Sequence, residues 1–500
     1  MKLLAAFLLV SALHAQTNIG GTWKIAVDRG DGTFENRYLQ LSQSGTTISG
    51  TVVRNYSKQK IQGGRFDGKK LHFEVNPWRD VIDDYDGILQ GDKLQMTITT
   101  RASANSHPGA VHGDAVHDSG AGMQPPAYIA PPALHDVADN GLVRTPPMGW
   151  NSWNHFASRV NDAVVRGAAD ALVSSGMKDA GYIYVNIDDT WEAGRDADGN
   201  IQTNKKFPDM KALADYVHSK GLKLGIYSSP GPTTCAGYEG SYGHEAQDAK
   251  TYASWGIDYL KYDWCSAGHI YKDSDLQPIY QKMGDALLQS GRPIVYSLCE
   301  YGNGDVWTWG TKVGGNLWRT TGDIANRWSS MEEIGFKQID IAQYEQPGHF
   351  NDPDMLEIGN DGLSPDEERT HMTLWSLLSA PLLAGNDLSK MSKETIGILT
   401  NRDVVAIDQD PAVNHPKRIL LEGKTEAWTR ELQDGSTVIA IFNRDNAAGS
   451  ATVSWSKLGL PAPTTARDLW NQKDVTFSGD SYTANVPRHG VVLLRVPKSS

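Results

Sequence analysis

Between residues 148 and 385, short apolar runs typical of buried strands alternate with amphipathic segments of helical period. The strand candidates are 148–150, 182–188, 222–227, 258–263, 293–298, 317–321, 349–352 and 381–385. The helix candidates between them are 163–174, 209–220, 244–255, 276–289, 330–342 and 367–378. Eight strands that alternate with helices are the number that a closed parallel barrel requires. The pattern therefore predicts an α/β fold, a (β/α)8 TIM barrel over residues 144–410.

The chain on both sides of the predicted barrel has the period-two alternation of antiparallel strands. Residues 17–101 predict an N-terminal antiparallel β-domain, a sandwich or a barrel, with hairpin turns at Asp31-Gly32, Asp67-Gly68 and Asp86-Gly87. Residues 102–143, rich in Ala, Pro, Gly and His, predict a linker, and residues 411–500 predict a C-terminal antiparallel β-sandwich. Two roles stay open for the N-terminal domain: carbohydrate binding on Trp23 or Trp78, and a structural spacer.

Residues 1–15 have the features of a secretory signal peptide, with Lys2 before an apolar run and cleavage expected after Ala15. We therefore expect a secreted or periplasmic protein. In an oxidising compartment, three cysteines allow at most one disulfide. Cys235 and Cys265 both follow predicted strand ends, so we pair them and leave Cys299 free. Three buried thiols are the alternative.

The charge pattern restricts the class of partner. The formal net charge is −12 and Lys and Arg are not clustered, which argues against nucleic acid. After the N-terminal run, no apolar stretch is long enough to span a bilayer, so we expect no membrane association. The high count of 15 Trp fits both a large core and the stacking of Trp on sugar rings.

Two of the predicted strands end in a carboxylate with a basic residue close by. Lys261 and Asp263 lie two residues apart in the segment 259–265, so both point to the same side of the strand. The segment 316–324 repeats this arrangement with Arg319 and Asp323. Two such carboxylates predict acid/base or nucleophilic chemistry on a neutral polyol.

In a (β/α)8 barrel, polar residues at the carboxyl ends of the strands form the site. Those at the predicted strand ends are Trp150, Trp153, Asp188, Asp189, Tyr227, Lys261, Asp263, Glu300, Arg319, Asp323, Asp352 and Asp354. A single Asp after a strand is usually a cap or a turn residue. Six or more on one rim instead indicate a functional site.

These residues lie in segments that resemble glycoside hydrolase family 27, the α-galactosidases and α-N-acetylgalactosaminidases. The resembling segments are 147–153, 187–189, 223–227, 259–263, 318–324 and 351–355. They follow the family's order over roughly residues 145–410, and the N-terminal β-domain lies outside the resemblance. Among the family's enzymes, the chain is most similar to the α-galactosidases.

The resemblance implies a retaining, exo-acting α-galactosidase with Asp263 as nucleophile and Asp323 as general acid/base. Asp263 has to stay ionised, and Lys261 stabilises its charged form. Asp323 has to hold a proton near neutral pH, and Arg319 in contact with it would lower its pKa. We therefore assign Arg319 to a substrate hydroxyl.

The remaining rim residues are expected to form the sugar cage. The resemblance implies that Asp188 and Asp189 bind the axial 4-OH and the 6-OH of galactose, and that Trp153 packs on the apolar face of the ring. Tyr227, Lys261 and Asp354 would complete the cage. Glu300 would occupy the space beside the 2-OH and exclude an N-acetyl group. The partner is then an α-galactoside carbohydrate, with no cofactor and no metal.

Other readings stay open beside this one. Within the family, the alternatives are an α-N-acetylgalactosaminidase and a β-L-arabinopyranosidase, and outside catalysis the alternative is a galactose-binding protein. A metal-dependent enzyme would use Asp188, Asp263 and Asp352 as oxygen ligands. Three positions that border the site depart from the family pattern, namely Trp264, Ser229-Pro230 and Tyr301.

Overall fold

The computed structural model describes residues 17–78, 81–101, 109–463 and 465–498. The predicted signal peptide, residues 1–15, lies outside them. The chain divides into two compact units, Met1–Pro125 and Pro126–Ser500. In the described part of the chain, none of the helices combines the length and the apolar character needed to span a membrane.

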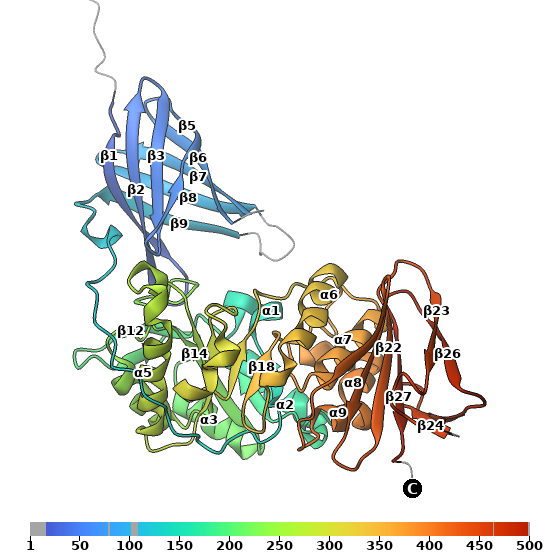
Figure 1. The fold of residues 1–500 in the computed structure, drawn as a ribbon. Helices are drawn as coiled ribbons and strands as arrows, with labels where there is room; N and C mark the ends of the chain where they lie inside the picture. Colours follow the sequence, from blue (N-terminus) through green and yellow to red (C-terminus); the bar gives the residue numbers. More distant parts are fainter. Residues whose placement is uncertain (1–16, 79–80, 102–108, 464, 499–500) are drawn as a thin grey trace, which may run out of the picture. The chain divides into compact units, whose positions relative to one another are not determined.

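The first unit is an antiparallel β-barrel (Figure 1). Its strands are β1 (Gly21–Asp28), β2 (Phe34–Ser44), β3 (Thr47–Arg54), β4 (Ser57–Lys60), β5 (Gln62–Phe66), β6 (Lys70–Trp78), β7 (Val81–Gln90), β8 (Lys93–Arg101) and β9 (Gly109–His117). They pair in the order β2-β1-β9-β8-β7-β6-β5-β3-β4, and an additional β2–β3 pairing closes the sheet on itself. Alternate residues point inward to a separate hydrophobic core.

Three expectations for this unit are wrong. Gly109–His117, expected in a linker, forms β9 and pairs with β8 and β1. Its Gly, Ala and His residues have weak strand propensity, so tertiary pairing rather than local preference makes it a strand. Asp86-Gly87 lies within β7 and is not a turn. Trp23 is buried in the core and cannot stack on a ligand, while the side chain of Trp78 lies outside the described part of the chain.

The second unit contains the predicted parallel barrel. Its strands are β10 (Met148–Asn151), β11 (Tyr184–Asn186), β14 (Lys223–Ser228), β15 (Tyr259–Asp263), β16 (Val295–Cys299), β17 (Leu317–Arg319), β18 (Phe350–Asp352) and β19 (Leu382–Ala384). They pair in the order β18-β17-β16-β15-β14-β11-β10-β19. A parallel bridge between Leu356 and Ala384 connects the chain after β18 to β19 and completes the ring. All eight strands match the sequence-based prediction.

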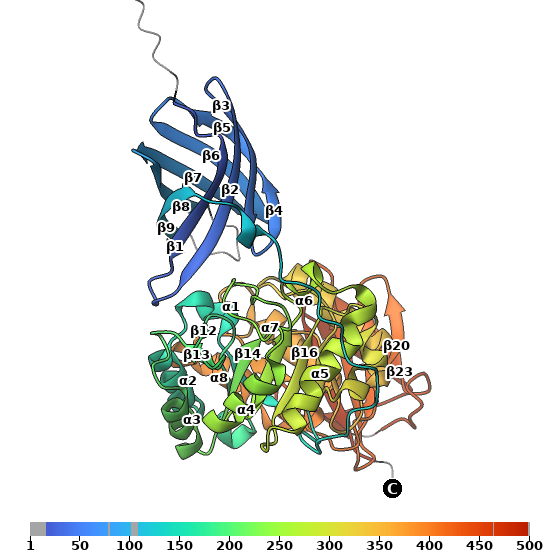
Figure 2. The ribbon, with the colours of Figure 1, turned by 90° about the vertical axis from the view of Figure 1, so that its left-hand side faces the viewer.

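Helices cover the outside of this ring, as Figures 1 and 2 show. They are α2 (Asp162–Ser174), α3 (Met210–Ser219), α4 (Glu245–Trp255), α5 (Leu276–Leu288), α6 (Trp328–Lys337), α7 (Pro365–Leu377), α8 (Lys393–Leu399) and α9 (Arg402–Asp408). Local signals set several of their ends. Ser364 and Glu367 form a capping box at the start of α7, where Pro365 follows the cap. The short helices α8 and α9 and the hairpin β12 (Glu192–Arg195) and β13 (Ile201–Thr203) were not expected.

After the barrel, the chain forms the expected antiparallel sandwich. Its strands are β20 (Lys417–Glu422), β21 (Thr425–Glu431), β22 (Thr437–Asn443), β23 (Gly449–Ser454), β24 (Thr465–Asp468), β25 (Lys473–Thr476), β26 (Ser481–Val486) and β27 (Val491–Val496). One sheet has the order β20-β21-β22-β27-β24-β25, and β23 pairs with β26. Trp428 and Phe442 of the larger sheet make edge contacts with Phe336 of α6, so the sandwich packs on the barrel.

Candidate active site

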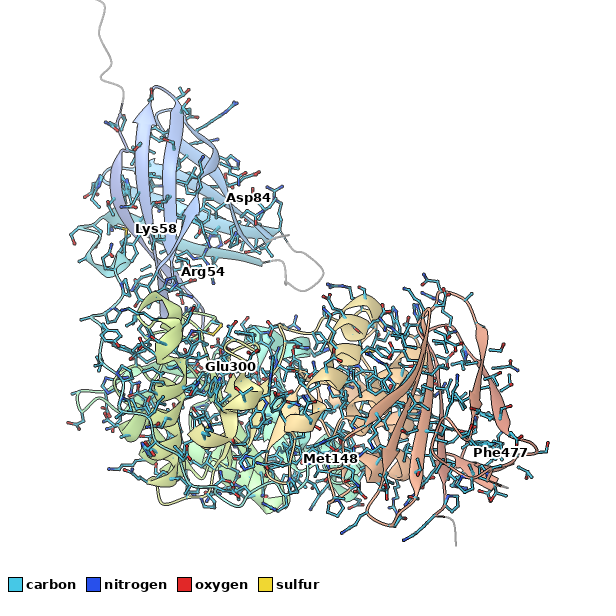
Figure 3. The ribbon with its side chains drawn as sticks, in the orientation of Figure 1. Arg54, Lys58, Asp84, Met148, Glu300 and Phe477 are labelled. Atoms are coloured by element: carbon cyan, nitrogen blue, oxygen red, sulfur yellow. A yellow bond between two sulfur atoms is a disulfide. The ribbon has the colours of Figure 1, made fainter. Side chains whose placement is uncertain are left out.

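The predicted site residues lie at the carboxyl end of the barrel strands. Tyr227 is in β14, Asp263 ends β15 and Arg319 ends β17. Figure 3 shows Glu300, which follows β16, at the opposite end of the barrel from Met148, which begins β10. Trp150 is the exception to the expected rim. It is fully buried and its ring nitrogen donates to the backbone oxygen of Asn386 at 2.8 Å, so it belongs to the core.

Asp263 is buried and two tyrosine hydroxyls hold its carboxylate. Tyr301 donates to Oδ1 at 2.7 Å and Tyr227 donates to Oδ2 at 3.1 Å. Burial raises the pKa of Asp263 to about 6, although the positive charge of Lys261 and the hydrogen bond from Tyr301 act against this rise. The charge of Asp323 also raises the pKa of Asp263, which means that the two carboxylates interact. Asp263 is therefore ionised at neutral pH, as a nucleophile must be.

Lys261 binds a different carboxylate from the expected one. Its ammonium nitrogen donates to Oδ2 of Asp188 at 2.8 Å and lies 5.3 Å from the centre of the Tyr227 ring. Asn151 donates to the same Asp188 oxygen at 2.9 Å. Lys261 therefore acts on Asp263 through its electric field and fixes Asp188 by direct contact.

Arg319 pairs with two carboxylates, and one of them is Asp323, a contact that was not expected from the sequence. Its Nη2 lies 3.1 Å from Oδ1 of Asp323 and 3.0 Å from Oδ2 of Asp354. Burial raises the pKa of Asp323, but the positive charges of Arg319 and Lys261 and the hydrogen bond from Arg319 outweigh this effect and leave the pKa below its usual value. The Asp323 side chain keeps 71% of its surface exposed. Arg319 in contact with Asp323 does lower its pKa, as expected, but the expectation that the two residues do not touch is wrong. The chain bends at Thr321 and Gly322, between the two residues.

Asp188 and Asp189 lie side by side after β11. Oδ2 of Asp189 accepts from the backbone nitrogen of Ala236 at 2.7 Å, whereas its buried Oδ1 has no partner among the described residues. Burial raises the pKa of Asp189 to about 7. Trp153 is half-buried at the start of α1 (Trp153–Phe156), where its backbone nitrogen donates to Asn151.

Glu300 is the most deeply buried of these carboxylates. Its side chain is fully enclosed, and neither carboxylate oxygen accepts a hydrogen bond from a described side chain. The backbone N–H groups of Glu300 and Gly302 lie close enough to lower its pKa in part. Burial raises the pKa of Glu300 well above its usual value. A buried carboxyl group without a side-chain partner is costly for a fold, so it is typical of a site that a ligand completes.

Cys235 and Cys265 form the expected disulfide, with their Cα atoms 4.9 Å apart. Cys299 is buried and is the free thiol. The bridge ties the loop after β14 to the chain two residues beyond Asp263. The hydroxyl of Tyr227 lies 3.2 Å from Sγ of Cys265, so the bridge also contacts the groups around the carboxylate.

The metal-binding alternative required Asp188, Asp263 and Asp352 to converge on one ion. In the structure, Asp188 forms a salt bridge with Lys261, and the positive charge of Arg319 acts to lower the pKa of Asp352. Among the described residues, one group with suitable ligand spacing includes Asp263, together with Cys235 and Cys265. Those two sulfur atoms are joined in the disulfide and are not thiolates, so they are poor ligands.

Two contacts in the site were not expected from the sequence. Tyr301 was placed only at the border of the site, and Asn151 was not singled out. Tyr301 reaches Asp263 because its backbone adopts a φ of 62°, in the left-handed region. A left-handed backbone cannot be predicted from a tyrosine in the sequence, whereas a glycine often indicates one.

The chain is similar to known proteins over the parallel barrel and the C-terminal sandwich. A family model described as "Alpha galactosidase A" matches residues 145–410, and one described as "Alpha galactosidase C-terminal beta sandwich domain" matches residues 422–496. The chain is 46% identical over 359 residues to an alpha-galactosidase of Cyamopsis tetragonoloba, covering 71% of this chain and 86% of that protein. It is 44% identical over 380 residues to alpha-galactosidase A of Cellvibrio japonicus, covering 71% and 92%.

A solved structure gives the same result. The crystal structure of alpha-galactosidase I from Mortierella vinacea superimposes with a TM-score of 0.69 at 37% identity. The match covers 72% of this chain and 99% of that one. Residues before 145, which include the N-terminal barrel, lie outside both matched family models.

Proposed function

The chain belongs to glycoside hydrolase family 27, and from this premise we propose that it is an exo-acting α-galactosidase that retains the anomeric configuration. The substrate is a terminal α-linked galactose on an oligosaccharide, polysaccharide or glycoconjugate. The observation that carries the proposal is the contrast between two interacting carboxylates. Asp263 is buried between tyrosine hydroxyls, and Asp323 is exposed beside Arg319.

In the first half-reaction, ionised Asp263 attacks the anomeric carbon and the glycosidic C–O bond breaks. Asp323 gives its proton to the departing oxygen, so the leaving group departs as an alcohol. The product on the enzyme is a galactosyl ester of Asp263. Tyr227 and Tyr301 orient the attacking carboxylate, because each hydroxyl holds one of its two oxygens.

In the second half-reaction, Asp323 takes a proton from water as the water oxygen attacks the anomeric carbon. The ester bond breaks and Asp263 becomes a free carboxylate again. Two displacements at one carbon restore the original α configuration. Retaining enzymes hold the two carboxyl groups roughly 5–5.5 Å apart, which a crystal structure of a substrate complex would measure.

The other rim residues recognise the sugar. Asp188, fixed by Lys261, and Asp189, with one unpaired buried oxygen, are the groups that would bind the 4-OH and 6-OH. Trp153 is expected to lie against the ring's apolar face, and Arg319 and Asp354 to bind further hydroxyls. Glu300 is expected to bind the 2-OH, because its buried carboxyl group has no side-chain hydrogen bond among the described residues and a hydroxyl would supply one.

One pair of measurements tests this function. Initial rates on para-nitrophenyl α-glycosides of galactose, N-acetylgalactosamine and glucose, and on the β-L-arabinopyranoside, would identify the sugar. NMR of the first-formed product would identify its anomer. We expect α-galactose as the first product and the fastest hydrolysis with α-galactoside. A β-anomer would refute retention, and binding without turnover would indicate a galactose-binding protein.

Residues 1–15 support a further part of the proposal, which is export. Expression of the full chain, followed by N-terminal sequencing of the protein in the medium or periplasm, tests this. We expect the mature chain to begin at Gln16. An intracellular protein that still carries Met1 would refute export.

A further inference from the structure

The chain makes an unusual turn directly after β16. Glu300 is fully buried, Tyr301 has a φ of 62° and Gly302 has a φ of 84°. The backbone nitrogen of Asn303 donates to the oxygen of Glu300 at 3.0 Å and closes the turn. Gly302 is required here, since a Cβ at that position would clash with the carbonyl oxygen of Thr320. A bulky residue at positive φ is strained, and such residues concentrate at active sites.

The turn directs the Tyr301 hydroxyl onto Asp263. The hydrogen bond to Oδ1 is 2.7 Å long, which is shorter than the 3.1 Å bond from Tyr227 to Oδ2. The Tyr301 hydroxyl also lies 3.8 Å from Sγ of Cys235 in the disulfide. One tyrosine on each carboxylate oxygen leaves the Asp263 carboxylate little freedom to rotate.

The ring of Tyr301 contacts the other half of the site. The guanidinium carbon of Arg319 lies 5.7 Å from the centre of this ring, within the range of a cation–π interaction. The same guanidinium contacts Asp323 at 3.1 Å and Asp354 at 3.0 Å. Tyr301 therefore touches Asp263 with its hydroxyl and, with its ring, the cation that holds Asp323.

We propose that Tyr301 is a positioning residue for the hydrolytic reaction. Its strained turn holds the Asp263 carboxylate in the orientation for attack and couples it, through Arg319, to Asp323. This inference rests on the proposed function, because it requires Asp263 to be the nucleophile. Small errors in the position of a reacting group are costly, so a group that fixes the nucleophile contributes to the rate without touching the sugar.

The test compares three substitutions of Tyr by Phe in the full chain. Tyr301→Phe removes the proposed hydroxyl, and Tyr227→Phe removes the one on the other oxygen. Tyr271→Phe is the matched control, because the Tyr271 hydroxyl is buried without a partner among the described residues and lies outside the proposed machinery. The probe is 5-fluoro-α-D-galactosyl fluoride, which labels a nucleophile without help from an acid. Mass spectrometry of the intact protein gives the labelled fraction at each time. The labelling rate is then expressed per folded protein molecule.

We expect Tyr301→Phe to label Asp263 about 10- to 100-fold more slowly than wild type, with little change in the probe concentration at half-maximal rate. Its alkaline limb of kcat/KM should move to higher pH, because the carboxylate has lost a donor that stabilises its charged form. Tyr227→Phe should slow labelling as well, and Tyr271→Phe should not. A thermal unfolding midpoint within about 2 °C of wild type would show that the fold is retained.

The contrary result separates this inference from the proposed function. If wild type is labelled on Asp263 and Tyr301→Phe is labelled within twofold of the same rate, with an unmoved alkaline limb, the positioning role is refuted and the nucleophile stands. A lower unfolding midpoint with an unchanged labelling rate per folded site would also refute it. If Asp263→Asn is still labelled at the wild-type rate, the nucleophile assignment fails instead.

Discussion

Nη2 of Arg319 lies 3.1 Å from Oδ1 of Asp323, so the carboxyl group proposed to donate the catalytic proton is paired with a permanent cation. This contact lowers the pKa of Asp323, whereas burial raises the pKa of Asp263 to about 6. The nucleophile is thus the weaker acid of the two. The productive form has ionised Asp263 and protonated Asp323, so the pair must carry one proton in total. With one proton, the form that has the proton on Asp263 is more populated than the productive form.

The first prediction concerns pH. Because the productive state needs one proton on the pair, kcat/KM should fall above about pH 6, where that proton leaves Asp263, and should be highest at acidic pH. A profile of kcat/KM from pH 3 to 8 on an α-galactoside checks this. Incubation at each pH before assay at the optimum controls for unfolding. A maximum at neutral or alkaline pH would contradict the inverted order of the two pKa values.

The second prediction concerns the nucleophile. Asp263→Asn should abolish turnover and keep the fold, because the amide has the same shape and is a poor nucleophile. Circular dichroism and the thermal midpoint would verify the fold. In Asp263→Gly, added azide should restore activity and give the β-galactosyl azide. More than a few per cent of the wild-type rate in Asp263→Asn would rule out the assignment.

The third prediction concerns the acid/base. Asp323→Ala should lose about 10²–10⁴-fold in kcat/KM on substrates with poor leaving groups and much less on activated aryl galactosides. The reason is that a good leaving group departs without a proton. A plot of log kcat/KM against leaving-group pKa should become steep in the variant. Equal losses on both kinds of substrate would argue against this role for Asp323.

The fourth prediction concerns Glu300. We expect a strong preference for α-galactosides over α-N-acetylgalactosaminides. A steric clash of the N-acetyl group together with the loss of the hydrogen bond between the 2-OH and Glu300 costs roughly 3–5 kcal/mol, on the order of 10²–10³-fold or more. Glu300→Ser should raise N-acetylgalactosaminide activity and lower galactosidase activity. Values of kcat/KM measured separately on the two para-nitrophenyl substrates, for wild type and for the variant, check this. Comparable wild-type activity on both would show that Glu300 reads another part of the substrate, while the reaction type would stand.

The barrel could be predicted because the spacing of apolar residues along the sequence indicates which residues of each strand and helix are buried. Leu260 and Tyr262 alternate with Lys261 and Asp263, and in the structure the first two are fully buried in the core. Strand β9 could not be predicted in this way, since Gly109–His117 carries little apolar pattern and forms a strand by pairing with β8 and β1. Tyr301 was underestimated for a similar reason, because its left-handed backbone depends on the surrounding loop and not on its own preference.

The order of the barrel strands along the chain, and the acids, cations and tyrosines at their carboxyl ends, can be predicted from the sequence alone. Side-chain alternation and strand ends depend on residues that are neighbours in the sequence, so local sequence patterns predict them. The partner of each side chain follows from the three-dimensional fold: Lys261 binds Asp188, Arg319 binds Asp323 and Asp354, and Tyr301 donates to Asp263. These pairings depend on distances between separate strands and loops. They set the pKa values of the two carboxylates, because electrostatic energy falls with distance and grows with burial.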